Sequence, residues 1–221
     1  MSDLKPIKVW GKNGPNPPKV AIVLEELGLP YEIVDIPVFE SKRPDYVAIN
    51  PNGRIPAIHD PNTDLTLWES GAIVEYLVEK YDKDHKISFA PGSNDAFHAK
   101  QYLFFQVSGQ GPYYGQAVWF KKYHSENLPS AIERYVKETH RVTGVVEKIL
   151  ADTKVEPGSD GPWLVGGRYS YADLAWISWQ NVLGKVHTKE EFNEEDYPHV
   201  KAWLDKMRAR PAVKKVLDSL N

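Results

Sequence analysis

The sequence predicts an α/β region followed by an all-helical region. Strand-like and helical runs alternate in the first 85 residues, whereas no convincing strand pattern occurs beyond residue 95. The stretch between them is polar and rich in turn-forming residues, which is typical of an exposed connection. A chain of 221 residues is long enough for two small domains. We therefore predict one domain at residues 1–85, a linker at 86–93 and a second domain at 94–221.

The first three elements predict a right-handed βαβ unit with parallel strands. Ile7–Trp10 is a short, apolar, β-prone run, and Tyr31–Val38 resumes strand character. Between them, apolar residues spaced i, i+3, i+4 and i+7 from Val20 to Leu27 indicate an amphipathic helix that ends at Gly28. This order over about thirty residues fits a crossover connection between neighbouring strands.

A hairpin and a helix complete the first domain. A short polar helix is expected at residues 44–48. Ile55–Ile58 and Leu65–Leu67 are short β-prone runs, and the turn formers of Asp60–Asp64 between them suit an antiparallel pair. Helical spacing of apolar residues then runs from Ile73 to Tyr81.

Helical periodicity dominates the second domain. It runs from Ile132 to Ile149, from Val200 to Met207 and from Val213 to Leu220. A long helix that begins near Asn94 should kink at Gly109–Pro112, because the proline has no backbone donor.

Composition excludes several classes of protein. The hydrophobic fraction of 42% is too high for a disordered chain, and a net charge of −3 without a basic run argues against nucleic-acid binding. The absence of cysteine excludes disulfides and a cysteine nucleophile. The seven histidines show no metal-binding spacing, so no metal site is predicted. No apolar run approaches the ~20 residues of a membrane span, and we expect a cytoplasmic protein without a membrane partner.

Three segments carry candidate binding residues, and each has a structural alternative. Asn16, which precedes two prolines, is either a helix N-cap or a polar group that stabilises an anion together with the positive helix end. Ile55–Pro56 is either a plain turn or a cis bond that leaves the Ile55 backbone free to pair with an extended ligand. Glu69 and Ser70 either start a helix or receive an amine and a carboxylate, which together match an α-amino acid head.

Two further groups have mainly structural interpretations. Ser170-Tyr-Ala-Asp173 has the spacing of a capping box, with Asp in place of the usual Glu or Gln, and should lock the start of a helix. An aromatic-rich stretch after the predicted kink is either core or the wall of an apolar electrophile pocket. It contains Tyr113, Tyr114, Trp119 and Phe120.

The chain resembles the cytosolic glutathione transferases over almost its whole length. The resemblance is carried by residues 16–20 (Asn-Pro-Pro-Lys-Val), 50–58 (Asn-Pro-Asn-Gly-Arg-Ile-Pro-Ala-Ile), 68–73 (Trp-Glu-Ser-Gly-Ala-Ile) and 170–174 (Ser-Tyr-Ala-Asp-Leu). Residues 103–109, 115–117 and 133–135 look like the fungal branch that includes the yeast nitrogen-catabolite regulator with a prion form. Because the first predicted strand begins at Ile7, we expect no counterpart of the long Asn-rich prion segment of that branch.

The resemblance implies a thioredoxin-like N-terminal domain, an all-helical C-terminal domain, and a homodimer with one glutathione site per subunit at the domain boundary. Ile55, before a cis Pro56, would pair with the cysteinyl backbone of glutathione. Glu69 and Ser70 would hold its γ-glutamyl group. The fungal relatives carry a His at the position of Ser41, and Lys42 would substitute for it here as a point charge toward the glycyl carboxylate. The remaining expected glutathione contacts, mostly toward the glycyl end, are Ser41, Lys42, Asn52 and Arg54.

The resemblance also implies that Asn16 faces the sulfur, with Asn13 as the competing candidate. A free thiol has a pKa of about 8.5, and a hydrogen-bond donor at a helix N-terminus lowers it so that thiolate exists near neutrality. The implied activity is a detoxification reaction, the conjugation of glutathione to small apolar or aromatic electrophiles, with glutathione-dependent reduction of organic hydroperoxides at the same site. The alternative is a non-catalytic regulatory or ligandin-type binding protein that retains the fold.

Overall fold

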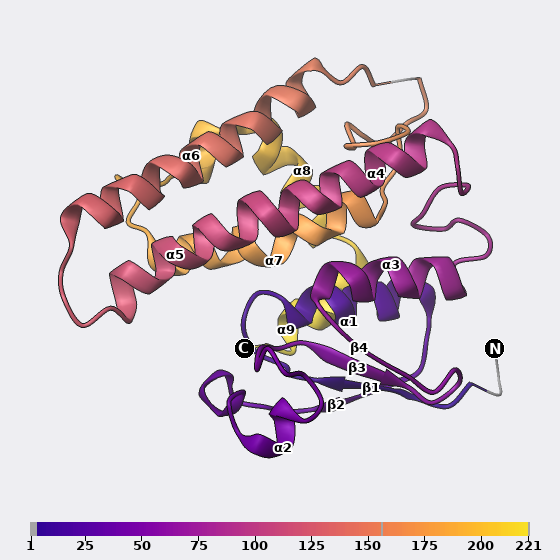
Figure 1. The fold of residues 1–221 in the computed structure, drawn as a ribbon. Helices are drawn as coiled ribbons and strands as arrows, with labels where there is room; N and C mark the ends of the chain where they lie inside the picture. The colour runs from indigo at the N-terminus through magenta and orange to yellow at the C-terminus, as the bar shows by residue number, and fades with distance from the viewer. Residues whose placement is uncertain (1–3, 156, 221) are drawn as a thin grey trace. The chain divides into compact units, whose positions relative to one another are not determined.

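The computed structural model describes residues 4–155 and 157–220. By their internal contacts they divide into two compact units, one up to Ser88 together with the segment from Ala209, the other from Phe89 to Arg208. The first unit contains a sheet with helices, and the second is built from helices (Figure 1). The predicted fold class, an α/β domain and an all-helical domain, is confirmed.

A mixed four-stranded sheet organises the first unit. Its strands lie in the order β2-β1-β3-β4. β1 pairs in parallel with β2 and antiparallel with β3, and β3 pairs antiparallel with β4. The βαβ unit and the hairpin therefore form as the sequence predicts. The strands are β1 (Ile7–Trp10), β2 (Tyr31–Val34), β3 (Ala57–Asp60) and β4 (Leu65–Trp68).

Strand β2 is four residues shorter than predicted. It ends at Val34, and the chain continues through the 3₁₀ turn η1 (Val38–Glu40) to the short helix α2 (Pro44–Val47). Pro37 has no N–H to offer a neighbouring strand, and most residues of this segment are exposed. Apolar residues there consequently gain no partner strand, and the segment forms a loop at the edge of the sheet.

Helices α1 (Pro17–Leu27) and α3 (Ser70–Tyr81) pack against each other on one face of the sheet (Figure 1). Their inward-facing apolar residues and those of the strands form the core of the unit, which includes the fully buried Ile7, Val20, Val23, Leu24, Ile58, Ile73 and Leu77. The start of α1 and the start of α3 are therefore held in fixed relation by a packed apolar interface.

The last helix, α9 (Pro211–Asp218), belongs to the first unit by its contacts, although the sequence boundary placed it in the second domain. It packs against α1 and buries Val213 and Val216. Just before it, Arg210 donates to the buried Glu26 of α1 through two hydrogen bonds of 2.8 and 3.0 Å. Periodicity shows that α9 is amphipathic, but it does not show which surface covers its apolar face.

We expect Arg210→Ala to loosen α9, because Glu26 would remain buried without its bidentate guanidinium partner. A lost hydrogen-bonded pair of this kind costs about 1–3 kcal/mol, so amide hydrogen exchange in α9 should accelerate about tenfold or more. Lys215→Ala is the matched control, since the pair of Lys215 with Glu25, 2.7 Å apart, has an exposed lysine and should be worth under about 1 kcal/mol. Equal acceleration in both variants would contradict the anchoring role of Arg210.

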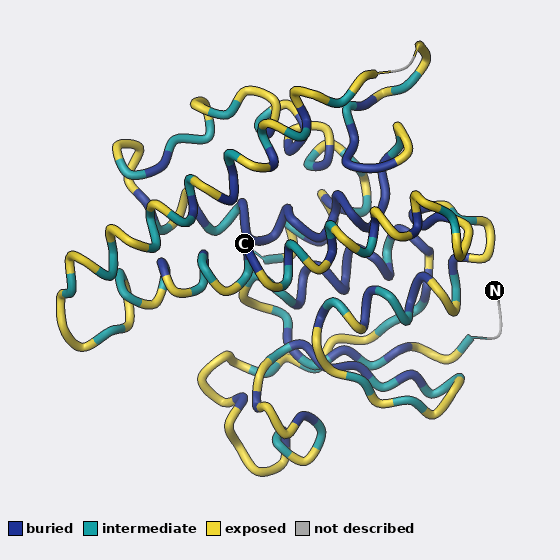
Figure 2. The backbone as a smooth tube through the Cα atoms, turned by 45° about the horizontal axis from the view of Figure 1, so that its top comes forward, coloured by how far each residue is buried: buried dark blue, intermediate teal, exposed yellow. Residues whose placement is uncertain are grey.

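The second unit is a set of helices around α7 (Tyr171–Val186), most of whose residues are buried. α7 packs against α4 (Asn94–Phe105), α5 (Gly111–Lys122) and α8 (Pro198–Arg208). The long helix α6 (Pro129–Asp152) packs against α5 and α8. From Thr139 to Leu150, buried residues recur along it between exposed ones (Figure 2). Among the described residues, no helix combines the length and apolar character needed to cross a membrane.

The break predicted at Gly109–Pro112 takes the form of a π-helical turn, η2 (Gln106–Gln110), between α4 and α5. Pro112 cannot donate to the preceding turn, which favours a local change of hydrogen-bond register. The buried amide of Gln106 donates to Gln110 (2.9 Å), and Gln110 donates to the carbonyl of Trp176 on α7 (3.1 Å). The break is thus fixed by polar contacts inside the helical core.

A buried carboxylate locks the start of α7. Ser170 and Asp173 form a reciprocal capping box, in which Ser170 Oγ accepts from the backbone N–H of Ala172 (3.2 Å) and Asp173 Oδ2 accepts from the N–H of Ser170 (3.0 Å). Asp173 Oδ1 also accepts from the N–H of Leu164 and the indole N–H of Trp203, both at 2.9 Å. Burial raises the pKa of Asp173 to about 6, and these hydrogen bonds act in the opposite direction.

Candidate functional site

Asn16 stands at the N-cap position of α1, but its side chain does not cap the helix. The structure shows no side-chain cap hydrogen bond, and Pro17 and Pro18 occupy the first helical positions, where they supply no N–H. Asn16 is half-buried, whereas Asn13 is exposed. The structure therefore does not support the capping alternative for the Asn16 side chain.

The loop before α1 touches the segment before β3. Gly11 has φ +99°, and a Cβ there would lie 2.7 Å from Cβ of Ile55, so only glycine fits. The Ile55–Pro56 peptide bond is cis. Ile55 precedes the ladder between β1 and β3, which begins at Ala57. Ile55 is thus placed beside the loop that leads to Asn16.

The turn at residues 50–54 is held by its own hydrogen bonds. Asn50 Nδ2 and the Tyr46 hydroxyl donate to the carbonyl of Arg54 at 2.6 and 2.8 Å. Lys42 Nζ donates to the carbonyl of Asn52 (2.8 Å), which ties the preceding loop to the turn. Gly53 permits this approach, because a Cβ there would lie 2.8 Å from the carbonyl oxygen of Ser41.

The four residues expected near the glycyl end of glutathione therefore lie together, with different contributions. The side chains of Lys42 and Arg54 are exposed and carry the positive charge. Ser41 is buried and its hydroxyl donates to the carbonyl of Val38 (2.8 Å), so it stabilises the turn. Asn52 is exposed. Its backbone carbonyl accepts from Lys42, and its backbone N–H donates to Asn50 Oδ1.

Glu69 and Ser70 start α3 with an unusual backbone. Glu69 has φ 72° and ψ 113°, a conformation that non-glycine residues rarely adopt and that is often found at binding sites. Its carbonyl accepts from the N–H of Ile73 (2.9 Å), and its side chain is exposed. Ser70, the first helical residue, is buried. A ligand at this corner would meet a carboxylate on one side and a hydroxyl at a helix N-terminus on the other.

Sequence reasoning missed Lys19, which lies in the first turn of α1 and is completely buried. Its Nζ donates to Ser70 Oγ at 3.0 Å, across 51 positions of sequence. Burial lowers the pKa of the Lys19 ammonium to about 7, although the Glu69 carboxylate raises it. The available signal was its spacing, since Lys19 stands four residues before Val23 and hence on the apolar face of the helix.

Together these contacts join the N-terminal ends of α1 and α3 beside the backbone of Ile55. Helix N-termini and an ammonium favour anions, and the Glu69 carboxylate favours a cation. The site thus suits an extended ligand with an amino acid head at Ser70 and Glu69, a peptide segment at Ile55 and a carboxylate near Arg54. Among the described residues, no group of three or more His, Asp or Glu side chains is placed to hold a metal ion.

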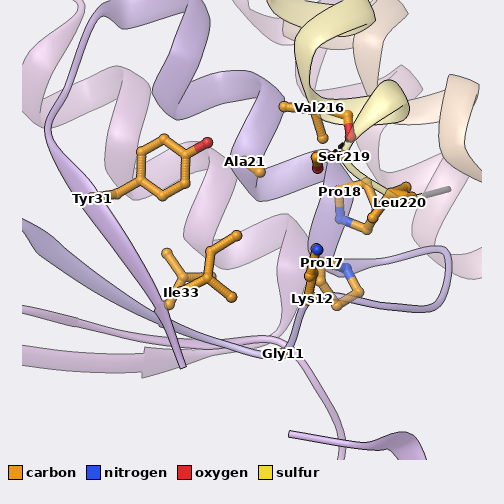
Figure 3. A pocket seen from close by; sticks show the side chains of 11 residues that line it. Gly11, Lys12, Pro17, Pro18, Ala21, Tyr31, Ile33, Val216, Ser219 and Leu220 are labelled. Atoms are coloured by element: carbon orange, nitrogen blue, oxygen red, sulfur yellow. Dashed lines mark hydrogen bonds between the residues drawn. The ribbon is translucent and has the colours of Figure 1, made fainter. Parts of the chain in front are cut away.

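A pocket lies on the other side of α1, next to the edge strand β2 (Figure 3). Tyr31 and Ile33 line it on one side, and Val216, Ser219 and Leu220 on the other. Its volume of about 20 Å³ holds about one water molecule, which is too little for a peptide ligand. The pocket therefore does not replace the corner at Ser70 as the candidate site.

The four aromatic residues proposed for an electrophile pocket lie on different faces of α5. Tyr114 is buried, and its hydroxyl is 2.6 Å from Thr143 Oγ1, so it belongs to the core of the second unit. Tyr113 and Phe120 face Tyr135 of α6, with ring centroids 6.5 and 5.5 Å apart. Trp119 is 48% exposed. The structure thus brings Tyr113 and Phe120 to the same neighbour, Tyr135, but not Tyr114 or Trp119, and the electrophile pocket stays a prediction.

Two family models match the chain. Residues 5–79 match the glutathione S-transferase N-terminal domain, and residues 115–219 match the glutathione S-transferase C-terminal domain. These two matched segments include the start of α1, the cis-proline turn and the start of α3, and most of the helical unit.

Individual proteins are similar over all or nearly all of the chain. The glutathione S-transferase-like protein gedE of Aspergillus terreus is 66% identical, over 100% of this chain and 98% of that protein. The structure of glutathione transferase URE2P6 from Phanerochaete chrysosporium, in complex with oxidized glutathione, is 47% identical with a TM-score of 0.89, and the match covers 100% of this chain and 98% of that one. The transcriptional regulator URE2 of Saccharomyces cerevisiae is 38% identical, over 93% of this chain and 66% of that protein.

Proposed function

The chain belongs to the glutathione S-transferase family. From this premise we propose that it binds glutathione where α1 and α3 begin and conjugates it, through its sulfur, to apolar electrophiles. The observation that carries the proposal is the hydrogen bond from Lys19 to Ser70, which joins the starts of α1 and α3, together with the half-buried Asn16 at the start of α1. An amide donor beside a helix N-terminus is what a thiolate needs for stabilisation near neutral pH.

The proposal gives each part of glutathione a partner. The γ-glutamyl amine pairs with Glu69, and the γ-glutamyl carboxylate is received by Ser70 and the first N–H groups of α3. The cysteinyl backbone pairs with the backbone of Ile55, in the manner of an added strand. Arg54 and Lys42 attract the glycyl carboxylate, and the sulfur lies at Asn16.

The chemistry requires no group beyond these residues and a second substrate. Asn16 lowers the pKa of the bound thiol by donating to the thiolate, and water accepts the released proton. The thiolate then attacks an electrophilic carbon, forming a C–S bond while the leaving group departs with the electron pair of the broken bond. With a halogenated aromatic substrate, the leaving group is halide.

Reduction of a hydroperoxide is proposed as a second reaction of the same thiolate. The sulfur attacks the terminal peroxide oxygen, which gives an alcohol and the sulfenic acid of glutathione. A second glutathione then forms oxidized glutathione and water. Because the chain has no cysteine, this second thiol cannot come from the protein itself.

The alternative function is a non-catalytic regulatory or ligandin-type role. The similarity to the transcriptional regulator URE2 favours this alternative. The alternative differs from the transferase function in one measurable respect, the absence of turnover. A homodimer and a cytoplasmic location are part of either proposal.

The test is calorimetric titration with glutathione and S-hexylglutathione, followed on the same sample by turnover of 1-chloro-2,4-dinitrobenzene, an isothiocyanate and cumene hydroperoxide. We expect saturable binding of both ligands and turnover of at least one substrate above the uncatalysed rate. Binding without turnover of any substrate would support the regulatory alternative. Absence of binding would contradict the glutathione site itself.

A further inference from the structure

A buried lysine is costly in a protein interior, and Lys19 is completely buried. It lies in the first turn of α1, where the helix dipole also disfavours a positive charge. An aliphatic residue at this position would pack without either cost. The position of Lys19 therefore calls for an explanation other than packing.

Its contact with Ser70 suggests that explanation. The ammonium group has only donors, so Ser70 Oγ must accept the 3.0 Å hydrogen bond from Lys19. A serine hydroxyl has one hydrogen, and this contact directs that hydrogen away from Lys19. Ser70 is thereby prepared to donate to an acceptor at the N-terminus of α3.

We propose that Lys19 is a positioning residue that orients the Ser70 hydroxyl and charges the start of α3, so that the site selects ligands with an α-carboxylate in their γ-glutamyl head. The inference rests on the proposed glutathione site and adds a selectivity element to it. Lys19 acts through Ser70, and no bond between Lys19 and the ligand is required.

The surrounding charges are consistent with this role. Glu69, at the start of α3, is the carboxylate that acts on Lys19. On α1 itself, Glu25 and Glu26 are engaged by Lys215 and Arg210 of the segment that forms α9. In the proposed complex Glu69 pairs with the ligand amine, so the ligand carboxylate becomes the additional negative charge near the ammonium of Lys19.

This arrangement makes affinity depend on pH. A carboxylate bound at Ser70 stabilises the ammonium form, so the pKa of Lys19, about 7 in the free protein, rises on binding. Affinity is then highest below pH 7 and falls as the pH rises through that value, because binding must take up a proton.

The experiment measures the affinity of S-hexylglutathione, whose thioether does not titrate, and of its analogue lacking the γ-glutamyl α-carboxylate, between pH 6 and 9. Lys19→Met preserves length and removes the charge, and Lys8→Met is the matched control on β1, where Lys8 lies beside Glu32 at the surface. At pH 6 we expect Lys19→Met to weaken S-hexylglutathione about 10- to 100-fold. The penalty for removing the ligand carboxylate should be about tenfold or more smaller in Lys19→Met than in the wild type, because Ser70 and the N–H groups of α3 remain, and it should be unchanged in Lys8→Met.

The pH profile separates positioning from a structural role. The ratio of wild-type to Lys19→Met affinity should approach one at pH 9, whereas a packing defect would persist at every pH. An unchanged carboxylate penalty in folded Lys19→Met would overturn the inference. If Lys19→Met does not fold, the two ligands are compared on the wild-type protein alone. The loss of affinity caused by removing the ligand carboxylate must then become smaller between pH 6 and pH 9. A loss that stays constant with pH overturns the inference. Failure of the wild-type protein to bind S-hexylglutathione would instead contradict the proposed function.

Discussion

Asn16→Ala is expected to reduce the conjugation rate near pH 6.5 about 10- to 100-fold, because the bound thiol loses the donor that stabilises its thiolate. The midpoint of the pH–rate profile should move upward by about 1–2 pH units. Above pH 9 the wild-type and variant rates should converge, since the thiolate then forms without assistance. Steady-state kinetics with 1-chloro-2,4-dinitrobenzene from pH 5.5 to 9.5 measure both effects.

Asn13→Ala is the matched control, because Asn13 belongs to the same loop and is exposed. It should leave the rate and the profile within twofold of the wild type. The reverse outcome, a shifted profile for Asn13→Ala and an unshifted one for Asn16→Ala, would transfer the role to Asn13. An equal loss at every pH would show that Asn16 acts on binding or on structure instead of on the thiol.

Asp173→Ala is expected to cause the largest loss of stability. The carboxylate accepts from Leu164, from Ser170 and from the indole of Trp203, and all of these donors would lose their partner inside the second unit. Removal of such a buried, fully bonded group costs about 3–5 kcal/mol. The Tm should fall by about 6–20 °C in a thermal scan.

Two milder variants calibrate that result. Ser170→Ala removes the helix cap and the 3.2 Å hydrogen bond that the hydroxyl donates to Asp173 Oδ2, and it should cost about 1–2 kcal/mol. Asp152→Ala removes an exposed aspartate that pairs with Lys148 at the end of α6, and it should change the free energy of unfolding by less than about 0.5 kcal/mol. If Asp173→Ala were no more destabilising than Asp152→Ala, the carboxylate would not be the lock that its hydrogen bonds indicate.

Much of the first unit could be predicted because its signals are local. Ile7–Trp10 and Ile55–Ile58 are β-prone runs bounded by turn formers, although the second strand forms two residues later, at Ala57–Asp60. Gly28 ends α1 with φ 66°, as a C-terminal glycine should. The predicted end of β2 is wrong. Its apolar residues continue past Val34, but Pro37 has no N–H with which to bond a neighbouring strand.

The candidate site could be predicted from sequence only where motifs carry it. Asn16, Ile55 and Glu69 stand in short motifs whose turn and cap chemistry left a structural alternative open, and the resemblance to the family singled them out. The aromatic residues of α5 could not be assigned, because residue type does not reveal helix face. In the folded chain Tyr114 points into the core and Trp119 is largely exposed.

The order of elements, the two-part architecture and the resemblance to a family follow from the amino-acid sequence, since hydrophobic period and turn residues act over a few positions. Two contacts required the folded chain: Lys19 meets Ser70, 51 residues away, and Arg210 meets Glu26, 184 residues away. A lysine in a sequence pattern is ordinarily interpreted as a solvated charge. Its burial depends on which distant helix covers it, and that is settled by packing of the whole core.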